Sequence, residues 1–266
     1  MAGIPALGPS PAQGAVACSD VLRLLEDTPE SLESRAMLLA ADPCRIFGDD
    51  PRHSVILQPR IRLASIIGNP GRGTIRQALE QSEGGITLLA QAGQLTEARA
   101  AARGWREHDA VRLVRGHAPA PRRMASLRVR LVEAAGMASC RAFPEHVLDA
   151  VRSLPAAAEV AACWIGASPV SLCCAAWETE RWWDVFVYTL APHRSMGCAA
   201  AAAELLARRF LERGKLAVWF AYADNAASIQ LARRLGFLVV ERLTAFCPAE
   251  RRRETLMSVA SDEGRD

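Results

Sequence analysis

The chain has 266 residues and a mass of 28.7 kDa, which is enough for one large domain or two modest ones. Half of the residues are hydrophobic and 23% are charged, as in soluble globular proteins, and a dispersed net charge of +3 does not indicate nucleic-acid binding. No apolar run predicts a membrane span, and the first 20 residues lack the pattern of a secretory signal. The eight cysteines show no Cys-x-x-Cys spacing and the five histidines do not cluster. We therefore expect a reduced, cytoplasmic protein without a metal site.

The first half of the chain gives the weaker signals. Residues 1–18 are rich in Gly, Pro and Ala, and we predict that they are disordered. Residues 19–115 are predicted to form an N-terminal α/β region, with helices from Asp20, Thr28 and Thr96 and strands at 55–57, 61–66 and 111–114. The loop at 68–74 lies between a strand and a helix, but it has neither P-loop nor dinucleotide-loop spacing. Its Asn-Pro-Gly run predicts first of all a turn.

A linker is predicted at 116–123, and the pattern becomes sharper after it. The alternation at 127–131 predicts a half-buried strand, and the spacing of apolar residues at 144–154 predicts an amphipathic helix. A hairpin at 160–176 follows. The later predicted elements are a strand at 182–189, an Ala-rich helix after Arg194, a strand at 216–221, a helix at 225–235 and a strand at 237–246. Residues 248–266 form a polar tail.

The turn after the strand at 182–189 is the most informative feature of the chain. It carries Arg194-Ser195-Met196-Gly197-Cys198-Ala199 and opens the Ala-rich helix. The first turn of a helix has uncovered backbone N–H groups and partial positive charge, so it suits a phosphate. Gly197 and Ala199 let an anion approach the main chain, and Arg194 adds a charged donor. The sequence therefore predicts a pyrophosphate-binding element.

Two motifs in this order resemble the GCN5-related N-acetyltransferase (GNAT) superfamily. They are the Arg-x-x-Gly-x-Ala run at 194–199 and Asn225-Ala226-Ala227-Ser228, which leads on to Leu235-Gly236-Phe237. The resemblance covers residues 124–247. It implies an α/β fold with a mixed sheet (α+β), the GNAT-like acyl-CoA N-acyltransferase fold, behind a less defined N-terminal α/β region. It also implies that the strand at 183–189 separates from the strand at 216–221, with the cofactor in the gap.

The resemblance further implies which residues contact acetyl-CoA, the expected cosubstrate. Main-chain groups of Val187 and Thr189 would pair with the pantetheine arm as an added strand does. Asn225 and Ser228 would contact the pantetheine or adenosine end, or else they only cap and line their own helix. The diphosphate would lie on the helix start, formed by Arg194, Ser195, Met196, Gly197, Cys198, Ala199 and Ala200.

The candidate acid–base residues follow from the chemistry that the reaction needs. An alkylammonium has a pKa near ~10, so a base must remove a proton before the amine attacks a thioester. Asp184, inside an apolar strand, must have a partner or face the cleft, and Glu180 lies in the turn before it. Solvated charges are the alternative for both. Ala232 stands where the superfamily usually has an acidic tyrosine, and Tyr222 is the candidate replacement, with aromatic packing as its alternative.

We therefore expect an acetyl-CoA-dependent N-acetyltransferase that acts on a primary amine of a small molecule. One alternative is an acyl-CoA-binding module with little or no catalysis, which the missing tyrosine would suit. Another is a protein N-acetyltransferase whose residues 1–120 form the acceptor or partner surface. No nucleic acid, membrane or metal is expected as a partner, and a homodimer is left open. The sequence determines neither the acceptor nor the acyl chain length.

Overall fold

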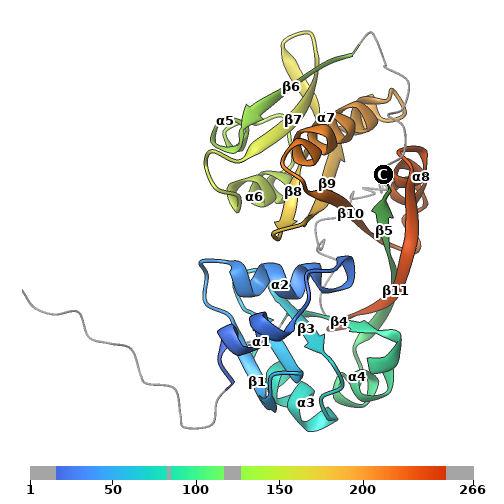
Figure 1. Cartoon of the computed structure of the whole chain (residues 1–266). Helices are drawn as coiled ribbons and strands as arrows, with labels where there is room; N and C mark the ends of the chain where they lie inside the picture. The colour runs from blue at the N-terminus through green and yellow to red at the C-terminus, as the bar shows by residue number, and fades with distance from the viewer. Residues whose placement is uncertain (1–15, 83–84, 117–126, 250–266) are drawn as a thin grey trace, which may run out of the picture.

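The computed structural model describes residues 16–82, 85–116 and 127–249 (Figure 1). Residues 1–15 of the segment predicted to be disordered, residues 117–123 of the predicted linker and residues 250–266 of the predicted tail lie outside the described residues. The disorder prediction is wrong at Cys18, which is the first residue of a helix. Asp20 was predicted to cap this helix, but the helix begins two residues earlier, after Ala17, and Asp20 lies in its first turn.

Within its described residues, the N-terminal half forms five strands and four α-helices. The predicted helices and strands of this half are all present, while β1 and β4 are additional. In chain order the elements are α1 (Cys18–Leu24), η1 (Pro29–Ser31), α2 (Leu32–Leu39), β1 (Arg45–Asp50), β2 (His53–Gln58), β3 (Leu63–Ile67), α3 (Arg72–Glu80), β4 (Thr87–Gln91), η2 (Ala92–Gln94), α4 (Leu95–Ala101) and β5 (Arg106–Arg115).

The C-terminal half contains every element predicted for it, and one short additional helix, α5. The predicted hairpin is the antiparallel pair of β7 and β8. The elements are β6 (Arg128–Glu133), α5 (Ala134–Ala138), α6 (Glu145–Arg152), β7 (Glu159–Ile165), β8 (Ser168–Glu178), β9 (Trp182–Thr189), η3 (Ala191–His193), α7 (Cys198–Glu212), β10 (Leu216–Tyr222), α8 (Ala226–Arg234) and β11 (Phe237–Cys247).

The eleven strands in the described part of the chain join in one mixed sheet, in the order β1-β2-β3-β4-β11-β5-β10-β9-β8-β7-β6. Two strands are exchanged between the halves. β5 belongs to the N-terminal half but lies between β10 and β11, and β11 lies between β4 and β5. Figure 1 shows β5 (green) and β11 (red) running side by side from one half to the other. The strands of the two halves therefore interleave in one sheet, and the predicted boundary at 116–123 stays a prediction.

The two halves repeat one order of elements. Two helices, three antiparallel strands, a helix, a strand, a helix and a last strand occur first from α1 to β5 and again from α5 to β11. In each half the third strand is parallel to the fourth: β3 to β4, and β9 to β10. In each half the fourth strand pairs with the last strand of the other half. The sheet is thus built from two copies of one unit, with β6 as an additional edge strand.

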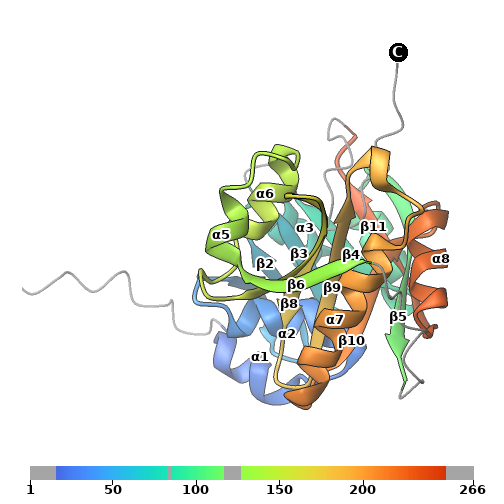
Figure 2. The same ribbon diagram turned by 90° about the horizontal axis from the view of Figure 1, so that it is seen from above.

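Helices cover both faces of the sheet (Figure 2). In the C-terminal half, α7 and α8 pack on one face, where Trp183 stacks on Phe210 with ring centroids 4.5 Å apart. The other face carries α5 and α6, against Phe186 and Tyr188 of β9. Because neighbouring strand residues point to opposite faces, β9 is buried on both sides along its whole length. This explains its mainly apolar and aromatic sequence, in which Asp184 is the one charged residue.

A buried ion-pair cluster joins the halves where the exchanged strands meet. Arg112 of β5 donates through Nη2 to Glu33 of α2 at 2.7 Å and also pairs with Glu241 of β11. Arg112 and Glu33 are both buried. Removing one partner of such a cluster leaves an uncompensated charge, which costs about 3–5 kcal/mol. The cluster therefore fixes α2 of the first half over the sheet of the second.

Candidate functional site

A gap opens between β9 and β10. The two strands pair at only three positions, Leu216 with Trp182, Ala217 with Trp183 and Val218 with Asp184. Both strands then continue, β9 to Thr189 and β10 to Tyr222. The separation predicted from the sequence is therefore confirmed. Backbone groups on the facing edges of such a gap are available to an extended ligand that binds as a strand would.

The start of α7 lies at the end of β9 and is open to solvent. Gly197, the residue before the helix, has a φ of 83°, and Ser195 has a φ of 61°. Ser195 and Met196 are exposed, and no side chain caps the helix among the described residues. The first-turn N–H groups of a helix have no partner within the helix, so this start can accept an anion. Gly197 is thus needed for a left-handed turn as well as for its small size.

The remaining predicted residues of this loop surround the helix start. Arg194 donates through Nε to the carbonyl of Thr189 at 3.4 Å, which ties the turn to the last residue of β9. Cys198 is buried, while Ala199 and Ala200 are half-buried and pack toward the core. The structure therefore brings all seven predicted residues of the loop together at the mouth of the gap.

Val187 and Thr189 lie on the part of β9 that borders the gap. Both side chains are buried, Val187 in the core under α7 and Thr189 in a 2.7 Å hydrogen bond with Ser171 of β8. The prediction for these two residues concerned their main-chain groups. Main-chain pairing with a ligand requires that the two side chains pack away from the gap. The contacts of both side chains meet this condition.

Asp184 is the last residue of β9 to pair with β10. Its carboxylate is 4% exposed, and Oδ1 accepts the N–H of Phe220, across the start of the gap, at 3.3 Å. Burial, and next the charge of Glu33, raise the pKa of Asp184 well above its usual value. Arg112 and the N–H groups of Phe220 and Val185 lower it in part. A carboxyl group with a raised pKa is, when ionised, a stronger base than an ordinary carboxylate, and Asp184 lies at the inner end of the gap.

Glu180 is in a different environment. Its side chain is 50% exposed, and both of its oxygens accept hydrogen bonds from Arg35 at 2.7 Å. This pairing with Arg35 lowers the pKa of Glu180 to about 2. A carboxylate with so low a pKa is a weak base. The solvated-charge alternative therefore fits Glu180 better than a catalytic role.

Tyr222 ends β10 on the face that packs against the N-terminal half. Its ring is buried, in edge contacts with His108 at 5.8 Å and with Phe220 at 5.6 Å between centroids. It belongs to a core cluster with Val21 of α1 and Met37 of α2. These contacts match the packing alternative for Tyr222. Its role as an acid stays a prediction.

The second predicted cofactor segment caps a helix. Asn225 precedes α8, and its Oδ1 accepts the N–H of Ser228 at 3.0 Å. The hydroxyl of Ser228 is buried and accepts the indole N–H of Trp219 at 2.9 Å. Both side chains therefore fit the alternative prediction, in which Asn225 caps α8 and Ser228 lines it. Ala232 is fully buried in the core under α8.

The sequence analysis missed Arg112 and Glu33, whose charges act on Asp184. Arg112 stands alone among apolar residues in the middle of β5, and such a charge predicts a buried partner. That signal does not name the partner. Glu33 is 79 residues away in the chain.

The comparisons with known proteins agree with this geometry. Residues 133–237 match the family model described as Acetyltransferase (GNAT) family. The C-terminal half of this chain belongs to the GNAT acetyltransferase family. Members of the family use acyl-CoA, and the gap beside an open helix start suits that cofactor. No protein with a curated description matches the chain.

Solved structures similar to this chain extend over both halves. A GCN5-related N-acetyltransferase-like protein from Streptococcus suis is 17% identical, with a TM-score of 0.66 over 87% of this chain and 99% of the other. A GCN5-related N-acetyltransferase from Kribbella flavida is 14% identical, with a TM-score of 0.60 over 85% and 95%. A tandem GNAT protein from the clavulanic acid biosynthesis pathway is 13% identical, with a TM-score of 0.54 over 88% and 90%. At such identities the likeness shows the GNAT fold alone.

Within residues 16–82, 85–116 and 127–249, no three His, Cys, Asp or Glu side chains are grouped so that they could hold a metal ion. In the same ranges, no helix has the length and apolar character needed to cross a membrane.

Proposed function

We propose that this protein is an acetyl-CoA-dependent N-acetyltransferase that acetylates a primary amine of a small molecule. One observation carries the proposal: the uncapped start of α7 lies directly beside the gap between β9 and β10. The helix start supplies N–H groups for the diphosphate, and the gap supplies a backbone edge for the pantetheine arm. Acetyl is the acyl group for which the family is named.

In the proposed reaction the neutral amine attacks the thioester carbonyl carbon. The bond from carbon to sulfur breaks, the acetyl group becomes an amide, and the CoA thiolate leaves. Asp184 is the proposed base, direct or through water, because it lies at the inner end of the gap and its raised pKa makes its ionised form a stronger base than an ordinary carboxylate. A thiol, whose pKa is ~8.5 in cysteine, leaves as the thiolate at modest cost, so the reaction does not require the missing tyrosine.

An acyl-CoA-binding module without turnover is the second candidate. It is favoured by the buried Ala232 at the position of the usual tyrosine and by the packed ring of Tyr222. Thiol release from acetyl-CoA in the presence of a panel of small amines separates the two candidates. Binding without thiol release for any amine would support the module and contradict the enzyme.

The cofactor loop is tested by a matched pair of variants at Ser195. This residue is exposed and has a φ of 61°, a conformation that Asp and Asn tolerate. Ser195→Asp adds a negative charge where the diphosphate is proposed to bind, so we expect acetyl-CoA affinity to fall about tenfold or more by titration calorimetry. Ser195→Asn, of the same size but neutral, should stay within about threefold of the parent. Equal affinities for the two variants would contradict the proposed loop.

A further inference from the structure

The internal repeat allows the two gaps to be compared residue by residue. β3 pairs with β4 at Leu63, Ala64 and Ser65 and then separates from it, as β9 separates from β10 after Asp184. Ser65 is the third residue of its strand and Asp184 is the third of its own. The N-terminal half therefore has a gap of the same construction, with a serine in place of the proposed base.

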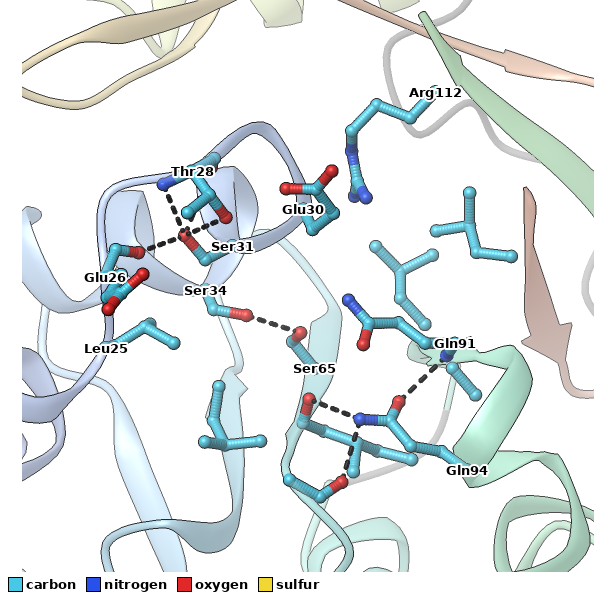
Figure 3. Close-up of a pocket in the computed structure, with 16 residues that line it drawn as sticks. Leu25, Glu26, Thr28, Glu30, Ser31, Ser34, Ser65, Gln91, Gln94 and Arg112 are labelled. Carbon is cyan, nitrogen blue, oxygen red and sulfur yellow. Dashed lines mark hydrogen bonds between the residues drawn. The ribbon is translucent and has the colours of Figure 1, made fainter. Parts of the chain in front are cut away.

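A glutamine bridges this second gap. Gln94 immediately precedes α4, as Asn225 precedes α8. Its Nε2 donates to the carbonyls of Ile66 and Gly68, at 3.2 and 2.9 Å, on the β3 side of the gap. Its Oε1 accepts the N–H of Gln91, at 2.8 Å, on the β4 side (Figure 3). The side chain of Gln94 thus satisfies, on both edges, the backbone groups that an extended ligand would need.

The start of the second helix is also occupied. α3 follows β3 as α7 follows β9, and the backbone N–H of Arg72, the first residue of α3, donates to Oε2 of Glu97 at 3.0 Å. A carboxylate from α4 therefore already lies where the helix start would otherwise attract an anion. At the start of α7, the preceding residue is Gly197, which has no side chain that could act as a cap.

The space beside the bridge does not suit a diphosphate. It is a pocket of about 240 Å³ on the α2 side, and its lining includes Glu26, Glu30 and Arg112. Figure 3 shows Ser34 of α2 reaching Ser65 across it, in a hydrogen bond of 2.6 Å. The guanidinium of Arg112 already pairs with two buried carboxylates. The added carboxylates of Glu26 and Glu30 make this pocket unfavourable for an anionic ligand.

We infer that the N-terminal half is a second copy of the acyl-CoA-binding unit whose site is filled by its own side chains. Gln94 takes the place of the pantetheine amide groups, and Glu97 takes the place of the phosphates. The chain then binds one acyl-CoA, at the gap between β9 and β10. The N-terminal half instead supplies β5 to the common sheet and α2 to the cover of β9. The inference rests on the proposed function only for the site in the C-terminal half.

Titration calorimetry of the full chain with acetyl-CoA tests the stoichiometry. We expect one mole of acetyl-CoA per mole of chain with the parent, and with Ser195→Asp the same single site weakened about tenfold or more. Two moles with the parent, or a site of parental affinity retained in Ser195→Asp, would overturn the inference. No binding at all would agree with a filled N-terminal gap but would contradict the proposed function, so the two failures are distinguishable.

The bridge itself is tested without a ligand. Gln94→Met keeps the length of the side chain but removes its three hydrogen bonds, so we expect the melting temperature to fall by about 5 °C or more. The amide of Gln91 should then exchange with deuterium about tenfold faster or more. Gln230→Met, on the exposed surface of α8, is the control and should change neither quantity. Unchanged exchange at Gln91 in the Gln94 variant would overturn the bridge.

Discussion

At the scale of single residues, the site depends on a carboxyl group placed where it is costly to ionise. Asp184 lies between two apolar neighbours in a strand that is buried on both faces. Its hydrogen bond with the N–H of Phe220 and the nearby Arg112 offset only part of the cost. Glu180, four positions earlier, keeps an ordinary surface ion pair. Two carboxylates close together in sequence thus have pKa values shifted in opposite directions.

The opposite pKa shifts of Asp184 and Glu180 predict how a substitution at each residue affects kcat. Asp184→Asn removes the proposed base but can keep the hydrogen bond with Phe220, so we expect kcat to fall about 100-fold or more. Glu180→Gln should change kcat by less than about threefold, because an exposed ion pair contributes little. Both are measured by thiol release with an amine that the parent acetylates. A fall in kcat for Glu180→Gln alone would reverse the assignment.

The raised pKa also predicts a pH-dependent stability. Between the usual carboxyl pKa of ~3.9 and the higher pKa of Asp184 in the folded chain, the unfolded chain loses this proton and the folded chain keeps it. This contribution to stability is therefore fully present below pH ~4 and is lost as pH rises through the folded pKa. Asp184→Asn avoids the loss, so we expect it to melt a few degrees higher than the parent at pH 7. Thermal melts at pH 7 and pH 4 should show this advantage shrink at pH 4.

At the scale of elements, two loops of similar sequence character have different roles. Both follow a strand and begin a helix, and both contain glycines. The loop before α7 leaves the helix start open, whereas the loop before α3 is fixed to its surroundings. Gly68 has a φ of 56°, and a Cβ added there would lie 2.1 Å from the carbonyl oxygen of Arg52. The turn predicted from Asn-Pro-Gly is thus a packed structural turn.

A pair of alanine substitutions tests this assignment. Gly68→Ala forces a Cβ into the backbone of Arg52 at a positive φ, and we expect it to lower the free energy of unfolding by more than about 2 kcal/mol. Gly73→Ala lies in the exposed part of α3, where an added Cβ meets nothing within 4 Å. It should raise that free energy by about 0.5–1 kcal/mol. Urea unfolding measures both, and a neutral Gly68→Ala would contradict the packed turn.

At the scale of the whole molecule, the exchanged strands make the halves interdependent. Without β11 the N-terminal half has nothing between β4 and β5, and without β5 the C-terminal half has nothing between β10 and β11. Each isolated half would expose unpaired backbone at the centre of its sheet. The ion pairs of Arg112 with Glu33 and Glu241, which hold α2 against the sheet, would also be disrupted.

This arrangement predicts the behaviour of separate fragments. We expect that residues 1–120 and residues 121–266, produced separately, show no cooperative thermal transition by circular dichroism. Mixing them should restore both the transition and the binding of acetyl-CoA, because the strands can pair between chains. A fragment of residues 121–266 that melts cooperatively by itself would show that the exchange is dispensable.

The sequence alone determined the features that depend on neighbouring residues. The apolar run of β9, the turn with Arg194 and Gly197, and the start of α7 were all predictable because strand pattern, turn and helix start are local properties. β1 and β4 were not predicted. β1 carries Gly48 followed by two aspartates, which are disfavoured in strands, and β4 ends in Ala90-Gln91 and leads directly into a helix.

Only the tertiary structure decided the long-range relations. The pairing of β5 with β10 and β11, the placement of Glu33 near Asp184, and the reach of Gln94 across the first gap all join residues distant in the chain. One sequence shows that Arg112 and Asp184 need partners, because a buried charge must be compensated. It cannot show which partners, because many polar residues could serve and only the packing of the two halves selects among them.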